Sequence, residues 1–524
     1  MKPLFSVIPT LLLTLACVFP ALADKSNNIL DYASTKDIRD INPHLYSGEM
    51  AAQNMVFESL VLNTEKGVTP YLAQRWDISP DGKSYTFYLR HDVTFSDGEP
   101  FNAKAVKLNI EAVLDNYERH AWLELVRQID SVEVVDEFTV KLNLKNPYYP
   151  TLTELGLTRP FRFISPNSFI NGKTKTGVAN YIGTGPWVLT EHKKDQYAEF
   201  KVNPNYWGEK PVLNGVMWRV IPDRQTMLLS LQKGDIQLIF GADGDMLDMD
   251  SFEALMASDK FKTEMSAPIA SRAIVLNSSR PMTSNQHVRQ ALQYAVDKEG
   301  IAQGILAGSE RVADTLMARS VPYCDFSSPT YAYQPTKAVE LLEAAGWVLP
   351  KGETIRQKDG QKLQLLLSYN VNNAVEKEIA ELIQDDFKKI GVGLMILGEE
   401  KQAYLDRQKN GDFDLQYSLS WGTPYDPASF VSSFRIPAHA DYQGQKGLAN
   451  KAQLDAMIGE LLITPNEARR QELYKTLFTS LAEQAVYIPL TYSRTKAIHR
   501  SELENVGFNP SQYEIPFEKM HFKP

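Results

Sequence analysis

Two apolar runs on either side of a helical pattern, between residues 363 and 397, constrain the fold of this chain more than any other feature. Apolar side chains alternate over residues 363–367, as in a strand, and recur with helical spacing over residues 379–390. Gly391 is suited to end that helix, and residues 392–397 form a second apolar run. A strand, a helix and a strand in this order make a βαβ unit. The sequence therefore predicts an α/β protein.

The length of the chain predicts more than one folding unit. Its 524 residues exceed the roughly 100–200 residues of an ordinary domain. A hydrophobic content of 43% and a charged content of 23% are typical of a soluble globular protein. No low-complexity segment separates the parts. We therefore expect two lobes that are joined by short extended crossovers.

The first residues have the composition of a secretory signal peptide. Lys2 supplies the positive charge, residues 8–19 the apolar segment, and residues 21–23 the cleavage site with small residues. We expect cleavage after residue 23 and export to the periplasm. In an alternative interpretation Cys17 becomes a lipidated N-terminus, although Thr14, three residues earlier, suits such a signal poorly.

The mature chain would hold one thiol and an excess of acidic residues. Cys324 is the one cysteine after the signal, so an internal disulfide is excluded and large apolar cores must hold the protein together. Removal of Lys2 with the signal changes the net charge from −9 to −10. Nucleic acid is therefore not expected as a partner. No later run reaches the ~20 apolar residues that a membrane span needs.

Residues 413–443 have the pattern of a strand that leads into a site. Apolar side chains alternate from Phe413 to Trp421, which predicts a strand with one apolar face. Residues 422–427 contain a glycine and two prolines and must turn. Arg435 and His439 follow, so the stretch predicts a site that faces a cavity. The alternative is that the aromatic side chains belong to the core and that His439 lies on a surface loop.

Signals for catalysis and for a complete metal site are missing from the sequence. Neither G-x-S-x-G nor H-E-x-x-H occurs, and no two of the eight histidines are three or four residues apart. A single mature thiol excludes a cysteine-rich metal site. Nothing singles out a pair of carboxylates of the glycosidase type. We therefore expect no catalytic residues. A bound metal would take most of its ligands from water or from a small organic chelator.

Residues 71–101 resemble the signature of the extracellular solute-binding proteins of peptide and nickel ABC importers. Shorter stretches at residues 183–187 and 206–208 resemble the same family at comparable places, so the resemblance covers essentially the whole mature chain. Longer runs are more specific. INPHLY (residues 41–46) and RIPAHADYQ (residues 435–443) look like the nickel-binding members of the family.

This resemblance implies a non-enzymatic periplasmic protein that captures a nickel–chelator complex and delivers it to an inner-membrane ABC permease. The ligand would be nickel(II) with a small organic chelator such as histidine, and the protein would be a monomer. One alternative is a dipeptide- or oligopeptide-binding protein of the same fold. Such peptide binders resemble one another in placing an aspartate shortly after a tryptophan, whereas here the first acid after Trp421 is Asp426. An exported hydrolase is the other alternative.

The resemblance also implies the type II periplasmic binding protein fold, an α/β fold of two lobes with an inserted subdomain in lobe I. The signal peptide would occupy residues 1–23, and lobe I residues 24–268, with the inserted subdomain at roughly residues 66–185. Lobe II would occupy residues 269–492, and residues 493–524 would return to lobe I.

By the same resemblance, His439 would bind the metal directly through a neutral imidazole nitrogen. Two arginines would hold the carboxylates of the chelator, because a guanidinium can pair with a carboxylate through two hydrogen bonds. Aromatic side chains and one methionine would line the cavity. Otherwise the arginines would form surface ion pairs and the tryptophans would be core residues. The predicted chelator-binding residues are Arg119, Arg159, Trp122, Trp421, Tyr425 and Met50.

Two positions depart from the family pattern. Where the pattern has a pocket tyrosine before Ala-Arg-Gln, this chain has Leu405, with Tyr404 one place earlier. Near the C-terminus Tyr513 stands in place of a threonine. We expect both changes to alter the cavity wall and, with it, the choice of chelator.

Overall fold

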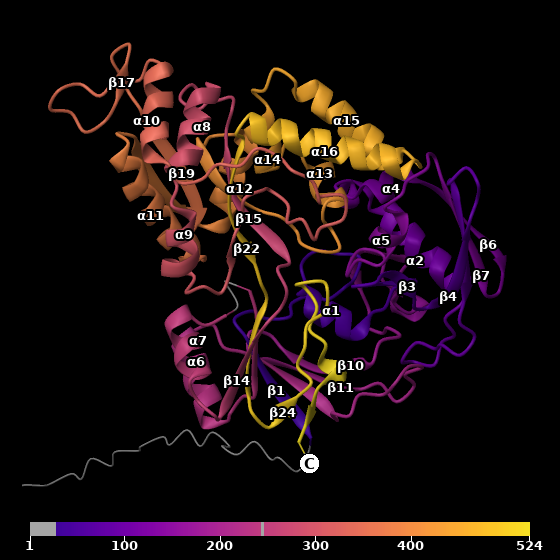
Figure 1. The fold of residues 1–524 in the computed structure, drawn as a ribbon. Helices are drawn as coiled ribbons and strands as arrows, with labels where there is room; N and C mark the ends of the chain where they lie inside the picture. The colour runs from indigo at the N-terminus through magenta and orange to yellow at the C-terminus, as the bar shows by residue number, and fades with distance from the viewer. Residues whose placement is uncertain (1–27, 243–245, 524) are drawn as a thin grey trace, which may run out of the picture.

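The computed structural model describes residues 28–242 and 246–523. The predicted signal peptide, residues 1–23, and Cys17 lie outside these ranges. Figure 1 shows two parts, one above the other, with a third part at the right that reaches both. Within the described ranges, every helix falls short of the length and apolar character that crossing a membrane would require.

The lower part in Figure 1 is built on a seven-stranded sheet. β1 lies inside this sheet and pairs in parallel with β12 and β13, whereas β23 runs antiparallel to β13 and β14. Because β23 comes from near the C-terminus, the chain returns to this sheet at its end. In spatial order the strands are β10 (Trp187–Lys193), β11 (Tyr197–Val202), β12 (Gly215–Val220), β1 (Ile29–Ser34), β13 (Leu238–Gly241), β23 (Lys496–Arg500) and β14 (Phe261–Met265).

The upper part is built on a six-stranded sheet. β19 and β20 pair in parallel and are connected by α11 (Ala374–Lys389), which confirms the predicted βαβ unit. Gly391 follows α11 with a φ of +76°, a left-handed conformation that glycine adopts without strain. In spatial order the strands are β16 (Arg311–Val312), β22 (Tyr487–Ser493), β15 (Ala270–Leu276), β21 (Leu415–Leu419), β19 (Gln364–Asn370) and β20 (Gly393–Glu399).

The third part is a four-stranded antiparallel sheet with α2 (Ala103–Asp115) packed on it. Asn102 begins α2, because its side chain accepts a hydrogen bond from Ala105 N at 3.0 Å. The strands are β4 (Ala73–Ile78), β5 (Ser84–Leu89), β7 (Thr139–Leu144) and β6 (Ile129–Asp136). Small strand pairs elsewhere are β2 (Val61–Thr64) with β3 (Gly67–Pro70), β8 (Phe169–Ile170) with β9 (Lys173–Val178), β17 (Gln357–Lys358) with β18 (Gln361–Lys362), and β24 (Leu503–Glu504) with β25 (His521–Phe522).

The remaining helices cover the sheets and frame the space between the parts. In the first half of the chain they are α1 (Met50–Val56), α3 (Tyr117–His120), α4 (Glu124–Gln128), α5 (Thr151–Leu155), α6 (Arg224–Lys233) and α7 (Met249–Met256). In the second half they are α8 (Gln286–Ala295), α9 (Lys298–Gly300), α10 (Pro335–Ala344), α12 (Lys401–Asn410), α13 (Ala428–Ser433), α14 (Ala440–Gln445), α15 (Lys451–Ile463) and α16 (Glu467–Glu483).

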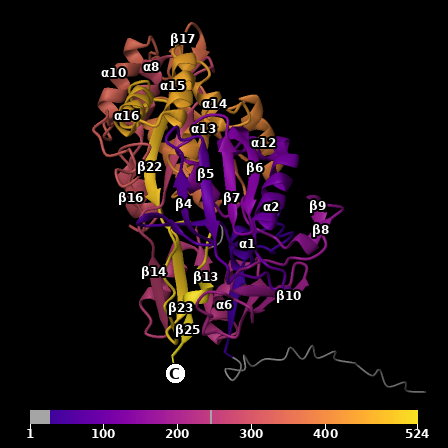
Figure 2. The same ribbon diagram turned by 90° about the vertical axis from the view of Figure 1, so that its right-hand side faces the viewer.

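We call the part with the seven-stranded sheet lobe I, the part with the six-stranded sheet lobe II, and the part with the four-stranded sheet the subdomain. The chain passes from lobe I to lobe II after Met265 and back after Ser493. These two connections run side by side, since Ser266 N donates to Thr495 O at 2.9 Å. Figure 2 shows β22 continuing into β23 across this junction. The exact residues at which the lobes and the subdomain divide stay a prediction.

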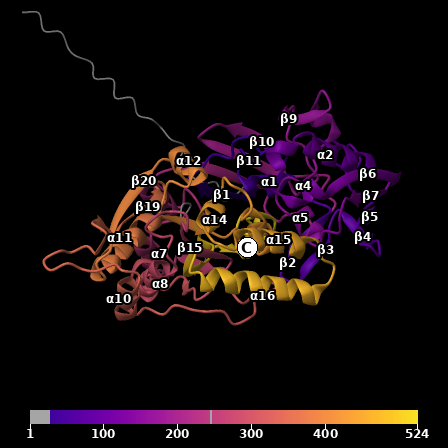
Figure 3. The ribbon, with the colours of Figure 1, turned by 90° about the horizontal axis from the view of Figure 1, so that it is seen from above.

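The largest apolar core joins the subdomain to lobe II. It contains Phe87 and Leu142 from the subdomain sheet, and Phe430, Leu461 and Leu477 from α13, α15 and α16. Seen from above, α15 and α16 extend from lobe II to the subdomain (Figure 3). The two parts therefore pack directly against each other, although long stretches of sequence separate them.

One predicted strand differs from the structure. The pattern predicts a strand from Phe413 to Trp421 with a single apolar face, but β21 is shorter and Leu419 is 44% exposed. β21 lies between β15 and β19 in the middle of the sheet. Both of its faces are covered, so Gln416 and Ser418 are buried as well.

Candidate ligand-binding site

A cavity of about 260 Å³ lies where lobe II meets lobe I and the subdomain. Six of the seven predicted site residues line it, and the seventh, Arg119, lies next to one of its walls. Tyr46 and Tyr513 complete the lining. The residues that line the cavity are Tyr46, Met50, Trp122, Arg159, Trp421, Tyr425, His439 and Tyr513.

Tyr46 is central to the wall that lobe I and the subdomain provide. Its hydroxyl accepts a hydrogen bond from Trp122 Nε1 at 2.7 Å and lies 2.7 Å from His120 Nδ1. The loop that carries Tyr46 is held against α1, because Gln53 Nε2 of that helix donates to Asn42 O at 2.9 Å. Sequence reasoning missed Tyr46 as a site residue. The INPHLY run that ends at this tyrosine was the available signal.

Two guanidinium groups lie over the ring of Tyr46. The central carbon of Arg159 is 4.9 Å from the ring centre and that of Arg119 is 5.5 Å away. Arg159 is half-buried and donates through Nη1 to Gly48 O at 3.1 Å, whereas Arg119 is exposed. Burial lowers the pKa of Arg159. Among residues 28–242 and 246–523, neither arginine has a carboxylate within ion-pair distance, and none of the lining residues is acidic.

Trp421 dominates the opposite wall, which comes from lobe II. Its ring meets that of Trp122 edge to face, with ring centres 5.4 Å apart, and thereby joins the two walls. The centre of the His439 imidazole is 6.0 Å from the Trp421 ring. The Tyr425 ring also packs against Trp421, with ring centres 6.2 Å apart, and contacts the Tyr513 ring at 5.7 Å.

Asp426 holds the turn after Trp421 and does not face the cavity. It is 4% exposed. One carboxylate oxygen accepts hydrogen bonds from Ser420 Oγ and Gly422 N, and the other from Trp421 N. Burial raises the pKa of Asp426 to about 6. The acid that a peptide binder would need for a peptide ammonium is therefore used inside the turn.

His439 stands at the N-terminal end of α14, where its side chain reaches the cavity. Burial lowers the pKa of His439, and the nearby Asp441 carboxylate opposes this shift. The imidazole is therefore neutral near pH 7 and can offer a nitrogen lone pair. In the part of the chain that the structure describes, there is no group of three or more His, Cys, Asp or Glu side chains able to hold a metal ion. A metal at His439 would need most of its ligands from elsewhere.

Two other residues that sequence analysis singled out lie away from the cavity. Arg435 pairs with Glu124 of the subdomain at 3.2 Å and does not line the cavity. Leu405 lies on α12, is 38% exposed and is likewise not a lining residue. Tyr513, by contrast, lines the cavity. The residue after it, Glu514, is fixed by a buried ion pair with Arg162 at 3.1 Å.

Comparison with known proteins places this chain in a family. Residues 67–442 match the family described as bacterial extracellular solute-binding proteins, family 5. The chain is 44% identical over 513 residues to the nickel-binding periplasmic protein of Escherichia coli strain K12, covering 98% of each chain.

Two solved structures extend the comparison. NikA from Brucella suis in complex with Fe(III)-EDTA is 45% identical, with a TM-score of 0.93, over 94% of this chain and 99% of that chain. NikZ from Campylobacter jejuni in complex with Ni(L-His) is 26% identical, with a TM-score of 0.80, over the same shares of the two chains.

These matches confirm four predictions made from the sequence. The fold is the mixed α/β, two-lobed periplasmic binding protein fold, because the similarity extends over nearly the whole chain. The family is one of binding proteins rather than enzymes, and the location is the periplasm. The chain belongs to the bacterial extracellular solute-binding proteins of family 5.

Proposed function

We propose that this protein captures a nickel–chelator complex in the periplasm and delivers it to an ABC importer. The observation that carries the proposal is the contrast between the two cavity walls: Arg159 and Arg119 on one, with no carboxylate within ion-pair distance among the described residues, and one neutral imidazole, His439, on the other. Membership of a family with nickel-binding relatives supports the same ligand.

The chemistry of these side chains requires a chelator. One imidazole cannot hold Ni²⁺ tightly against water, so the other coordination positions must be filled by a small organic molecule. The two guanidinium groups call for carboxylates on that molecule. Trp122, Trp421 and Tyr425 would enclose its apolar parts. A chelator such as histidine, with carboxylate and imidazole groups, meets these requirements, and the permease of the importer would be the protein partner.

Calorimetry with the purified mature protein tests this proposal. Ni²⁺ with histidine should bind more tightly than Ni²⁺ alone, because the arginines recognise the chelator. His439→Ala should weaken binding of the chelate by at least about 10–100-fold, the cost of losing an outer-shell partner of a metal ligand, because it removes a direct ligand. His287→Ala, which removes an exposed histidine on α8, is the matched control and should change nothing.

The competing peptide function makes the opposite prediction. Because Asp426 is buried in its own turn, dipeptides and tripeptides should bind weakly. Tight binding of a generic dipeptide would sink the nickel assignment. If His439→Ala bound the nickel chelate as tightly as the unchanged protein, ligation by His439 would be wrong, and the arginines and tryptophans would be recognising the chelator alone.

A further inference from the structure

Three side chains of the lobe I wall form a hydrogen-bonded chain whose direction can be worked out. Trp122 Nε1 carries a hydrogen and can only donate, so the Tyr46 hydroxyl oxygen must accept from it at 2.7 Å. The hydroxyl has one proton left, and His120 Nδ1 lies 2.7 Å away. We assign that proton to a hydrogen bond with Nδ1, which is then the unprotonated nitrogen of the ring. His120 is the tautomer that carries its proton on Nε2.

His120 suits this role because it stays neutral. Its side chain is fully buried, and burial, with Arg119 and His44 nearby, lowers its pKa to about 4. A charged His120 would carry a proton on Nδ1 and would compete with the Tyr46 hydroxyl. At neutral pH the chain from Trp122 through Tyr46 to His120 therefore keeps one direction and fixes the angle of the Tyr46 ring.

The Tyr46 ring in turn supports both guanidinium groups. Arg159 and Arg119 lie 4.9 Å and 5.5 Å from its centre, within the range of a cation–π interaction. Two like charges over one ring repel each other, and the electron-rich face offsets part of that repulsion. Gly48 O fixes one end of Arg159. A Cβ at Gly48 would come within 2.3 Å of Asp40 O, so the loop that carries Tyr46 has little freedom to shift.

We propose that Tyr46 is a positioning residue that aims Arg159 and Arg119 at the carboxylates of the ligand. This inference rests on the proposed function and adds to it. Selectivity for anionic chelators would depend on Tyr46, although its side chain is uncharged. The Trp122–Tyr46–His120 chain holds the ring, and the ring holds the two arginines. Loss of the ring should therefore release both cations at once.

The test compares two chelators of opposite charge with two variants. Tyr46→Leu removes the ring and the hydroxyl, whereas Tyr46→Phe keeps the ring and removes only the hydrogen bonds. By calorimetry, Tyr46→Leu should bind the nickel complex of EDTA about tenfold or more weakly, as expected for loss of a desolvated cation–π contact. The nickel complex of triethylenetetramine, which has no carboxylate, should bind the unchanged protein more weakly than the EDTA complex, and its binding should not fall in Tyr46→Leu. Tyr46→Phe should retain more than half of the selectivity for EDTA.

Controls separate this inference from the proposed function. Tyr333→Leu, at an exposed tyrosine of lobe II, should match the unchanged protein. EDTA without metal should show the same ranking of variants, so the arginines are tested even if nickel does not bind. Failure of the unchanged protein to bind any nickel chelate would sink the proposed function alone.

Two results would overturn the role of Tyr46. One is an equal loss of both nickel complexes in Tyr46→Leu, which would make the tyrosine a simple piece of the cavity wall. The other comes from crystal structures without ligand. If Arg159 and Arg119 occupied the same positions in Tyr46→Leu as in the unchanged protein, the ring would not be holding them.

Discussion

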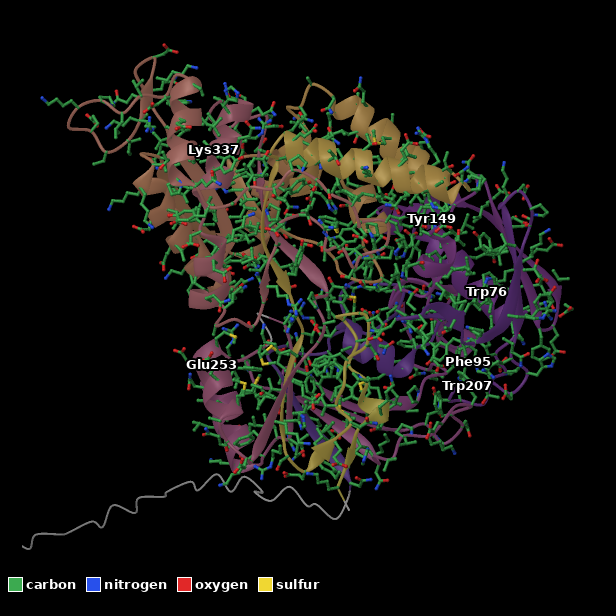
Figure 4. All side chains as sticks on the ribbon, in the orientation of Figure 1. Trp76, Phe95, Tyr149, Trp207, Glu253 and Lys337 are labelled. Carbon is green, nitrogen blue, oxygen red and sulfur yellow. The ribbon has the colours of Figure 1, made fainter. Side chains whose placement is uncertain are left out.

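Two of the contacts between lobe II and the rest of the molecule differ in how their charges are satisfied. One is the ligand cavity. The other, which we call the rim, is the contact of α13, α15 and α16 with the subdomain, where Ser429 Oγ donates to Glu154 Oε1 at 3.1 Å and Arg435 pairs with Glu124 at 3.2 Å. Figure 4 labels Tyr149 beside the end of α16, and its hydroxyl lies 2.5 Å from that of Tyr474.

At the rim Arg435 pairs with Glu124 across the contact, whereas in the cavity neither arginine has a carboxylate within ion-pair distance among the described residues. Arg470 of α16 lies over the Tyr149 ring at 4.3 Å, and Tyr149 hydrogen bonds to α16 as well. Glu154 is fully buried and accepts from Tyr148 Oη at 2.7 Å in addition to Ser429. The rim therefore joins lobe II to the subdomain through contacts within the protein, although Arg435 Nε and Arg470 Nε have no hydrogen-bond partner in the described part of the chain, while the cavity leaves its arginines for a ligand to neutralise. Changes at the rim should affect stability, and changes in the cavity should affect binding.

The largest expected effect comes from a substitution in the cavity. Arg159→Ala should weaken binding of a carboxylate-bearing nickel chelate by about 100-fold, since a hydrogen bond to a charged group contributes about 1.5–3 kcal/mol. Thermal stability should hardly change, because Arg159 gives up one hydrogen bond to Gly48 O and no ion pair within the described residues. Calorimetry and thermal denaturation measure the two quantities. Arg75→Ala, an exposed arginine of β4, is the control.

The next largest effect comes from a substitution at the rim. Glu154→Ala should lower the free energy of unfolding by about 2 kcal/mol, because buried donors lose their acceptor. Those donors are Tyr148 Oη, Ser429 Oγ and Leu125 N. Urea denaturation measures the change. Affinity for the chelate, compared under conditions where both proteins are folded, should stay within about threefold. A loss of affinity equal to that of Arg159→Ala would mean that the rim and the cavity are one unit.

Glu154 should also give the rim a pH dependence that the cavity arginines lack. Burial raises the pKa of Glu154 from its ordinary 4.5 to about 7. A carboxyl whose pKa is raised on folding stabilises the folded state fully below its unfolded pKa, and this contribution is lost as pH rises through the folded value. Between pH 4.5 and 7 the unchanged protein should lose up to about 3 kcal/mol of stability relative to Glu154→Gln. Parallel pH profiles of the two proteins would contradict this assignment.

The same comparison explains how much the sequence could predict. The lobe II wall comes from one stretch, residues 413–443, whose pattern indicated either a cavity-facing site or core aromatic residues with a surface histidine, and the sequence alone did not decide between them. The lobe I wall collects Tyr46, Arg159 and Tyr513 from distant segments, and no periodicity connects them. The resemblance supplied Arg159. Tyr46 was missed because its role depends on contacts with side chains more than 70 residues away.

The rim could not be predicted at all. Glu154 and Ser429 are 275 residues apart in sequence, and neither belongs to a recognisable motif. The sequence around Glu154 in the short helix α5 resembles that of many exposed helices, so it does not indicate that the acid is buried. The βαβ unit was predictable for the opposite reason: its strands and helix are neighbours in sequence, and their apolar spacing is set by local geometry.

The smallest expected effect comes from a substitution of Arg435, which lies between the rim and the cavity. Arg435 lies four residues before His439, yet it pairs with Glu124 at the rim and does not line the cavity. Its side chain is 25% exposed and Glu124 keeps Arg127 nearby at 3.8 Å. Arg435→Ala should therefore lower the free energy of unfolding by only about 0.5–1 kcal/mol.

A double-mutant cycle of Arg435→Ala and Glu124→Ala measures this pair directly. The coupling energy from urea denaturation should be about 0.5 kcal/mol, as for other partly exposed ion pairs. Affinity for the nickel chelate should not change, because the Arg435 guanidinium pairs with Glu124 of the subdomain and does not reach the cavity. If Arg435→Ala weakened the chelate as strongly as Arg159→Ala, then Arg435 would serve the ligand. Arg435 would then belong to the cavity rather than to the rim.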